Sequence, residues 1–409
     1  MSSNKSISSL EFTKISPDSN FDWINKRNDI FSTFTPLIQE KGESKEGIFN
    51  VKSVGIGSNR DYWVYGFSKD SVNNNMQRMV RNYNSEVDRL KEIKDSEEKV
   101  SLIKTEDSFI SWSRGLKNKL IKGEKISLDN DNLVQSLYRP FTKKWLYFDK
   151  QIIEMPSTFK KYLGEHNQII LVPGVGGKKD FSVFITDNVT NLQALGFASK
   201  VQCFYRFNNE SANDWLEINN SNINTNIVNE MGISDDELFY LVYGILHSKD
   251  YIKTFSNDLK KVTPRIPNLK NKDMYIKIGE QLADIHLNYE SVAPYDDLEI
   301  ITKNSNPSYI VEKMKYSKKG DKTSIKFNSD IEIRNIPIKA YDYIVNGKSA
   351  IEWVMDQYQI TLDKKSGILD NPNDYSEDET YIFNLLLSVI NVSIKTLDLI
   401  DELPILEFE

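Results

Sequence analysis

One stretch of the chain interrupts the periodic patterns on either side of it. Asparagine occupies nine of the 22 positions from Asn208 to Asn229, with almost no apolar periodicity. Because asparagine competes for backbone hydrogen bonds and favours turns, the chain is expected to break here into two lobes. Each lobe can build a core, since 39% of the 409 residues are hydrophobic. The expected division is a leading segment 1–45, a first lobe 46–207, a linker 208–230 and a mixed, largely helical second lobe 231–409.

Before the linker, short strand-like runs alternate with two amphipathic helices. Residues 48–67 predict two strands joined through 55–59. Apolar residues at steps of three and four predict a helix over 76–90, and a basic helix is predicted over 113–121. QIILVPGV and FSVFITD, separated by GGKKD within 168–187, predict a hairpin with a basic tip.

After the linker, helices and short strands are separated along the chain. A Ser-x-x-Glu pattern at 234–237 predicts a capped, buried helix through LFYLVYGIL. Residues 298–337 predict short strands and turns, and 338–358 predict a helix. A second Ser-x-x-Glu pattern at 376–379 predicts the start of a helix that ends before Pro404. Short strands with segregated helices are typical of a two-lobed α+β architecture.

Composition limits the compartment in which such a chain works. The single Cys203 excludes an internal disulfide framework and fits a reducing environment. The N-terminal MSSNKSISSLEF has no continuous apolar segment, so no signal peptide is expected. The most apolar run, 381–394, contains two Asn and two Ser and is expected to be too short and too polar to cross a bilayer. We therefore expect a cytoplasmic protein without a membrane partner.

The motifs of nucleotide, methyl-donor, nuclease and metal sites are incomplete. NGKS (346–349) lacks the glycine that a phosphate-binding loop requires at position 342. NPNDY (371–375) lacks the second proline of the segment that holds a flipped base in amino-methyltransferases. Glu-Ile-Lys at 92–94 belongs to a helix tail, and the three histidines are far apart in sequence. The chain is expected to hold no cofactor or metal and to have no catalytic activity of its own.

Side chains suited to DNA occur in the first lobe. Asn59 can bond in bidentate fashion to adenine, and Arg60 to guanine, unless Arg60 instead forms a local ion pair with Asp61. Arg114 and Lys117 are expected near one face of the basic helix, where they suit phosphate contact. The remaining candidates lie near a turn or at the predicted hairpin tip: Arg139, Lys143, Lys144, Lys178 and Lys179.

The charge distribution leaves two interpretations open. Residues 111–180 hold thirteen Lys or Arg against seven Asp or Glu, whereas the whole chain has a net charge of −7. A basic segment on an acidic body suits local phosphate contact combined with restrained nonspecific binding. The same surplus also fits an ordinary lysine-rich surface that is simply solvated.

Several distinctive segments follow one another in an order that resembles a known family. They include SNRDYWVY (58–65), SLYRPFTKKWLYFD (136–149) and the long block YDYIVNGKSAIEWVMDQYQITLDKKSGILDNPNDY (341–375). Together they resemble the C-terminal specificity region of Type ISP restriction–modification enzymes. The similarity runs from about Phe21 to Pro404.

The resemblance implies a target-recognition module whose first lobe faces duplex DNA and whose second lobe is a scaffold. A nuclease, a motor ATPase and an adenine methyltransferase, present in cis or in trans, would carry the S-adenosylmethionine, ATP and Mg²⁺. The chain would then be a separate subunit, a split gene product or a fragment. Within 341–375, Trp353, Val354 and Ile360 are expected to be buried, and Lys348 to contact phosphate or cap a helix.

Two other functions stay open at this point. The chain is alternatively a subunit or fragment of an adenine-specific DNA methyltransferase, as its parent family suggests. It is alternatively a protein-docking module that binds the methyltransferase without touching DNA. Binding of a methyl donor supports the first alternative, and DNA affinity that ignores charge reversal at the basic residues supports the second.

Overall fold

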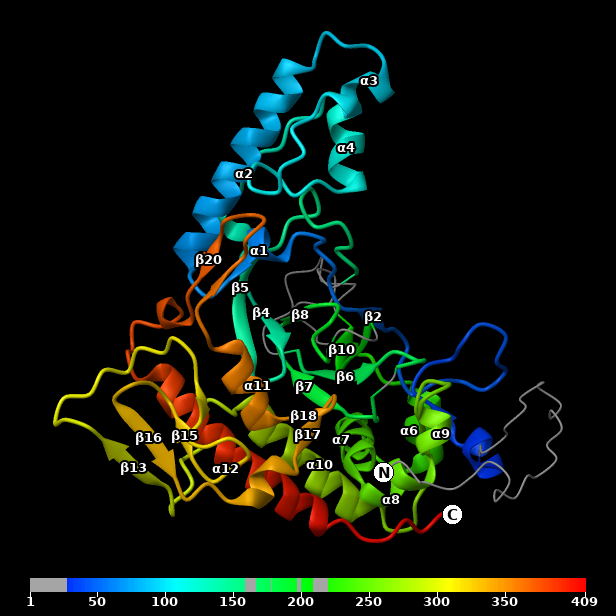
Figure 1. Cartoon of the computed structure of the whole chain (residues 1–409). Coiled ribbons are helices and arrows are strands. Elements are labelled where there is room, and N and C mark those ends of the chain that lie inside the picture. Colours follow the sequence, from blue (N-terminus) through cyan, green and yellow to red (C-terminus); the bar gives the residue numbers. More distant parts are fainter. Residues whose placement is uncertain (1–27, 159–166, 178, 197–199, 209–219) are drawn as a thin grey trace, which may run out of the picture.

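The computed structural model has an α+β fold in which a helical projection stands on a larger body (Figure 1). It describes residues 28–158, 167–177, 179–196, 200–208 and 220–409. Within these residues the sheets have two to four strands each. The predicted α+β class is therefore confirmed.

The basic helix forms at 114–121, close to its predicted bounds, whereas the long projecting helix begins at Lys69, seven residues before the predicted 76–90. The Ser68 hydroxyl caps the long projecting helix by accepting the Ser71 N–H, and apolar residues such as Met76 and Tyr83 line its buried side. Ser113 caps the basic helix in the same way. The described α-helices are α1 (Asp61–Val64), α2 (Lys69–Arg89), α3 (Ser96–Ser101), α4 (Arg114–Ile121), α6 (Thr225–Met231), α7 (Asp235–His247), α8 (Lys249–Thr254), α9 (Ser256–Leu259), α10 (Lys272–Leu287), α11 (Ala350–Gln357) and α12 (Tyr381–Asp401). Short 3₁₀ helices are η2 (Asp29–Thr33), η3 (Asn130–Asn132), η4 (Ile338–Tyr341) and η5 (Pro372–Asp374).

Three four-stranded sheets and four strand pairs complete the described secondary structure. In spatial order, the first sheet is β2 (Ser53–Val54), β9 (Val201–Tyr205), β6 (Ile169–Pro173) and β7 (Phe184–Thr186). The second is β3 (Tyr65–Gly66), β5 (Thr142–Tyr147), β4 (Leu133–Arg139) and β8 (Val189–Thr190). The third is β13 (Glu299–Thr302), β16 (Ile331–Arg334), β15 (Ile325–Lys326) and β14 (Lys315–Tyr316). The pairs are β1 (Thr35–Pro36) with β12 (Arg265–Ile266), β10 (Phe207–Asn208) with β11 (Asn220–Ser221), β17 (Ile344–Val345) with β18 (Lys348–Ser349), and β19 (Thr361–Leu362) with β20 (Leu369–Asp370).

The first sheet lies between two hydrophobic cores. Successive side chains of a strand point to opposite faces of its sheet, and β6 and β9 use both faces. One core receives Ile169, Leu171, Cys203 and Tyr205, and the other receives Ile170, Val172 and Phe204. The first core also contains residues from both predicted lobes. The two cores therefore do not divide at the predicted boundary 208–230.

The Asn-rich stretch is not a linker where the structure describes it. Strand β11 pairs with β10, and Asn224 caps α6. The buried Asn222 side chain donates to the carbonyl oxygens of Val51 (2.9 Å) and Tyr205 (2.8 Å) and accepts the Val51 N–H (2.9 Å). Asparagine bonds to backbone groups here as expected, but the groups belong to two remote segments, so the bonds hold this stretch in place instead of leaving it as a loop. Residues 209–219 lie outside the described part.

The predicted strand pair at 48–67 is also wrong. Strands β2 and β3 belong to different sheets, and the short helix α1 precedes β3. The turn before α1 forms because the Ser58 hydroxyl bonds to the Asp61 carboxylate and accepts the Arg60 N–H. By contrast, the predicted β6–β7 hairpin is confirmed, as are the strands within 298–337.

The helix predicted over 338–358 is confirmed only at 350–357. Asn346 and Gly347 both have positive φ (48° and 82°), which is the backbone of a two-residue Asn-Gly hairpin turn between β17 and β18. Asn-Gly is therefore a turn signal inside the range predicted as helix. Within this block Trp353 and Val354 are buried as predicted, whereas Ile360 is 37% exposed and its prediction is wrong.

The last helix begins later than its capping pattern suggests. The α7 capping box is confirmed, with Ser234 and Glu237 bonding reciprocally, but α12 begins at Tyr381 without a side-chain cap. It ends before Pro404, as predicted. Among the described helices, α12 is long and apolar enough to cross a membrane, so the expectation that this region is too short is wrong. Since 67% of its apolar window is buried inside the protein, α12 has the surroundings of a core helix.

Candidate nucleic-acid interface

Four of the predicted DNA-contacting side chains turn inward. Lys144 on β5 forms an ion pair with Asp370 on β20, with 2.6 Å between Nζ and Oδ2 and side-chain exposures of 12% and 10%. The Lys144 Nζ also lies 4.4 Å from the centre of the Phe67 ring. The other Asp370 oxygen accepts the Phe67 N–H at 2.9 Å. The expectation that Lys144 is presented to DNA is therefore wrong, because this lysine joins two distant segments of the body.

Lys143 and Arg139 are also engaged within the body. The Lys143 Nζ lies 2.6 Å from Glu290, whose other oxygen accepts the Tyr381 hydroxyl at 2.5 Å. Arg139 is buried and donates from Nη1 to the Tyr138 carbonyl (2.6 Å) and to Asn191 Oδ1 (3.0 Å). These contacts anchor the β4–β5 hairpin and correct the prediction that its cations face a ligand.

Arg60 fits neither of the two interpretations that its sequence context allowed. Its side chain is 3% exposed and donates from Nη1 to the Ile152 carbonyl. Burial lowers the pKa of the guanidinium to about 10, and the nearby Glu154 carboxylate acts in the opposite direction. Asp61 bonds instead to Ser58 and to the Tyr138 hydroxyl. Arg60 is thus a buried cation rather than a projecting side chain.

Three predicted residues do reach the surface, and they border one loop. Asn59 is exposed in a turn with φ of 58°, Arg114 is exposed at the start of α4, and Lys117 is half-buried one turn later. The loop 149–158 touches both regions, because Gly57 pairs with Met155 and the Gly115 N–H donates to Glu154 (3.0 Å). Within the described residues, no hydrogen bond or ion pair occupies the Arg114 or Lys117 side chain. Their contact with DNA stays a prediction.

The last predicted pair lies near the β6–β7 turn. Lys178 is outside the described residues. Lys179 is exposed, and its side chain passes over Gly347 so closely that an added Cβ there would lie 2.9 Å from Lys179 Cδ. Lys348, the residue after Gly347, pairs with Asp356 at 2.5 Å and lies over the Trp353 ring. Among the described contacts, Lys348 caps no helix.

A polar helix face that sequence reasoning missed lies on the outer side of α2. Asn74, Gln77 and Arg81 are exposed on successive turns, and 71–85 contains no acidic residue. Arg78 does not join this face, because its guanidinium is buried 4.5 Å from the centre of the Trp63 ring. This face lies opposite the buried residues Met76, Met79 and Tyr83, so it is directed away from the packed interior. The available signal was the run of amides at non-core helical positions without the usual acids.

Two exposed lysines lie at the base of the same helix. Lys364 and Lys365 are at the turn of the β19–β20 hairpin, which Figure 1 places beside α1 and the lower end of α2. Asp370 fixes the hairpin there through its bond to Phe67. The projection and the hairpin together carry basic and amide side chains that make no side-chain hydrogen bond or ion pair within the described residues.

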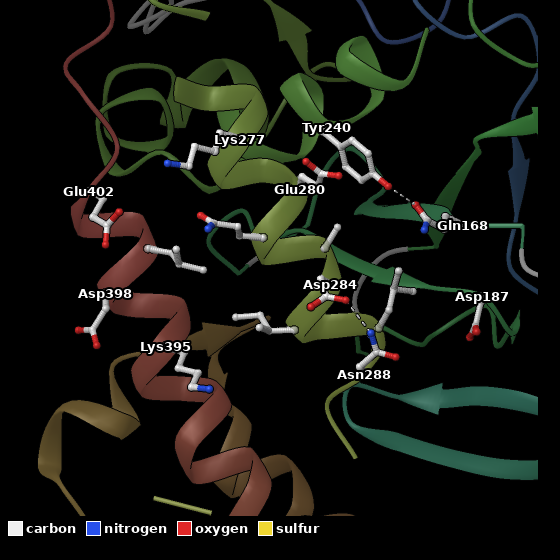
Figure 2. Close-up of a pocket in the computed structure, with 15 residues that line it drawn as sticks. Gln168, Asp187, Tyr240, Lys277, Glu280, Asp284, Asn288, Lys395, Asp398 and Glu402 are labelled. Carbon is white, nitrogen blue, oxygen red and sulfur yellow. Dashed lines mark hydrogen bonds between the residues drawn. The ribbon is translucent and has the colours of Figure 1, made fainter. Parts of the chain in front are cut away.

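A hollow of about 950 Å³ lies on the opposite part of the molecule, between α7, α10 and α12. Figure 2 shows Tyr240 bonded to Gln168 and Asp284 bonded to Asn288 at its wall. Five carboxylates line it against the two lysines Lys277 and Lys395: Asp187, Glu280, Asp284, Asp398 and Glu402. Such a surplus of negative charge repels a phosphate backbone. In the part of the chain that the structure describes, no group of three His, Cys, Asp or Glu side chains could hold a metal ion.

Comparison with protein families identifies the chain. The model of the Type ISP C-terminal specificity domain matches residues 47–385, which is more than half of the sequence. The chain belongs to this family. The resemblance drawn from the block 341–375 is therefore confirmed.

Two solved Type ISP enzymes are similar to this specificity domain over nearly its whole length. A nuclease-deletion mutant of LlaGI in complex with a DNA substrate mimic is 43% identical with a TM-score of 0.88, covering 98% of this chain and 31% of that one. The ATP-dependent enzyme LlaBIII bound to DNA is 37% identical with a TM-score of 0.87, covering 97% and 26%. The specificity domain thus spans less than a third of either enzyme.

A third solved structure has the same fold at a lower sequence identity. A DrdV–DNA complex has a TM-score of 0.81 at 24% identity, covering 99% of the specificity domain and 42% of that chain. None of the curated proteins matches the chain.

Proposed function

We propose that this specificity domain recognises a duplex-DNA sequence for a restriction–modification system, while methylation and cleavage belong to other domains. The observation that carries the proposal is the projection. It carries the exposed Arg81 and Arg114, the half-buried Lys117 and two exposed amides, and these side chains make no hydrogen bond or ion pair among the described residues. Cations of this kind bind phosphates, and amides and arginines bind base edges.

The family relatives support the same function. Both Type ISP enzymes that are similar over nearly the whole chain were solved with DNA or a DNA mimic. Because they are more than three times as long as the shared region, the catalytic and motor functions fit the remainder of such enzymes. S-adenosylmethionine, ATP and Mg²⁺ would bind there, in domains joined to this one in cis or in trans.

A randomised duplex library tests the proposal directly. The purified 409-residue chain is incubated with the library at several salt concentrations, and the bound DNA is sequenced. We expect one motif to be enriched, with affinity falling as salt rises because bound phosphates release counterions. Binding without enrichment contradicts sequence recognition by this chain alone, and no binding at low salt contradicts DNA contact.

Charge reversal at the α4 edge separates DNA contact from a purely docking role. Replacement of Arg114 and Lys117 by Glu is expected to weaken binding to all duplexes by tenfold or more at low salt, since two phosphate contacts become repulsive. Lys277→Glu on α10 is the control, because this lysine borders the acidic hollow. Unchanged affinity in the α4 variant favours the docking module instead.

A further inference from the structure

We propose that α2 is the base-reading element of the domain, with its outer face in the major groove and Asn74, Gln77 and Arg81 at base edges. This inference rests on the proposed DNA-recognition function and names the residues that give it specificity. It depends on three features of α2, namely its side-chain chemistry, its fixed orientation and its dimensions.

The chemistry of the outer face matches the groove rather than ordinary solvent. In the major groove an amide side chain pairs with both adenine N6 and N7, and arginine pairs with guanine O6 and N7. Asn74, Gln77 and Arg81 supply these groups at steps of three and four, on one face of the helix. On this face no carboxylate occurs between Asp70 and Asp88, which lie at its two ends, and the Asp88 carboxylate is paired with Lys125 (2.8 Å).

The orientation of this face is fixed by the packing behind it. Met76, Met79 and Tyr83 are fully buried on the inner side of α2. Asn82 donates to the Phe109 carbonyl (2.8 Å) and Asn84 to the Ile126 carbonyl (2.9 Å), which ties the sides of the helix to the neighbouring loops. The helix therefore cannot rotate about its axis without breaking these bonds. A fixed face is what distinguishes base reading from general attraction.

The dimensions of the projection also suit a groove. Asn74 and Arg81 are separated by about 10 Å along the helix, which corresponds to roughly three base-pair steps. A single α-helix fits the B-DNA major groove, and a helix packed behind it can cross the backbone, as in helix-turn-helix proteins. Here α4 lies beside α2 (Figure 1), and its exposed Arg114 and half-buried Lys117 are the cations that would meet phosphates at the edge of the groove.

The test compares the motifs enriched by three forms of the full chain. One is the wild type, and one carries Asn74→Ala, Gln77→Ala and Arg81→Ala. The third is a matched control with Lys277→Ala and Gln281→Ala, which removes a cation and an amide from the exposed face of α10. Alanine favours helix formation, so the α2 variant is expected to keep its circular dichroism spectrum and unfolding midpoint.

We expect the α2 variant to lose discrimination at two or three adjacent base pairs, by about tenfold or more at each, while the control enriches the wild-type motif. Arg81→Lys keeps the charge but not the bidentate geometry, and is expected to relax one position while binding to unrelated duplexes changes less than about twofold. An unchanged motif in the α2 variant overturns the inference but leaves the proposed function intact. Absence of enrichment by the wild type overturns the proposed function itself.

Discussion

Lys144 and Lys117 have the same charge and lie in the same basic segment, yet their surroundings give them different roles. Lys144 is paired with Asp370 in the interior, whereas Lys117 lies at the surface of α4. Removing the lysine of a nearly buried ion pair leaves its carboxylate partner without a compensating positive charge. Removing a surface lysine leaves no buried charge uncompensated.

We predict that Lys144→Met lowers the free energy of unfolding by about 3 kcal/mol, because Asp370 loses its cation. Lys117→Met is expected to change it by less than about 0.5 kcal/mol. Urea denaturation measures both. The effect on DNA affinity should be the opposite. Among correctly folded molecules, only the Lys117 variant is expected to bind DNA more weakly. Equal stability losses in the two variants would contradict the assignment of Lys144 to the interior.

The two described histidines form a buried neutral pair. The Thr396 hydroxyl donates to the Val392 carbonyl (2.7 Å), so it accepts from His286 Nε2 (2.8 Å). His286 Nδ1 then accepts from the Tyr243 hydroxyl (2.7 Å). Burial lowers the pKa of His247 to about 4, and burial together with His247 lowers the pKa of His286 well below its ordinary value.

This pair predicts a loss of stability on mild acidification. The folded-state pKa values lie below the unfolded value of about 6.5, so the stabilisation is complete above that pH and is lost as pH falls toward the folded values. For His247 alone the loss is about 2 kcal/mol between pH 7.5 and pH 5. Urea unfolding across this range measures it. His247→Phe should give a flatter profile, and identical profiles would show that His247 does not titrate as described.

At the scale of elements, the contact between α7 and α10 depends on two glycines. A Cβ at Gly279 would collide with the Tyr240 carbonyl oxygen, and a Cβ at Gly244 would collide with the Tyr275 carbonyl oxygen. The two helices therefore approach as closely as their backbones allow. Any side chain at either position must push the helices apart.

We predict that Gly279→Ala lowers the free energy of unfolding by about 3 kcal/mol through this overpacking. Gly123→Ala is the matched control, because Gly123 has φ of 72° and no atom within 4 Å of an added Cβ. Its cost is limited to roughly 1 kcal/mol of backbone strain. Thermal or urea unfolding measures both variants. Equal losses of stability would contradict the tight contact between α7 and α10.

Elements with local signals could be predicted from the sequence, and those that depend on distant partners could not. Helices α2, α4 and α7 combine a serine cap with apolar periodicity, so a window of about a dozen residues determines them. Asn222 was misread because its partners Val51 and Tyr205 are remote in sequence.

The same limit applies to the candidate interface. Lys143 and Lys144 were predicted to face DNA from their position near a turn. Their ion pairs could not be foreseen, because Glu290 and Asp370 follow them by 147 and 226 residues. Arg114 and Lys117 were correctly placed at the surface because the periodicity of their own helix decides it. The outer face of α2 was missed, because a polar helix face indicates a binding surface only when no other element of the fold covers it.

At the scale of the whole molecule, the shared first sheet makes the two sequence halves interdependent. Strands β6 and β9 supply side chains to both cores, while α7 and α10, after the Asn-rich stretch, belong to the second core. We predict that residues 28–208 and 220–409, produced separately, each lack a cooperative unfolding transition. Circular dichroism during urea titration checks this. A sigmoidal transition in either half would contradict a common folding unit.

The projection is inserted in the body in a different way. The chain leaves the second sheet at β3 and returns to it at β4, and both strands are direct neighbours of β5. Its two attachment points are therefore about 10 Å apart across the sheet. Replacing residues 68–132 as a block between related genes would re-pair no strand of the body. With α2 as the proposed base-reading element, recombination at two nearby junctions would give this domain a new target sequence in one evolutionary step.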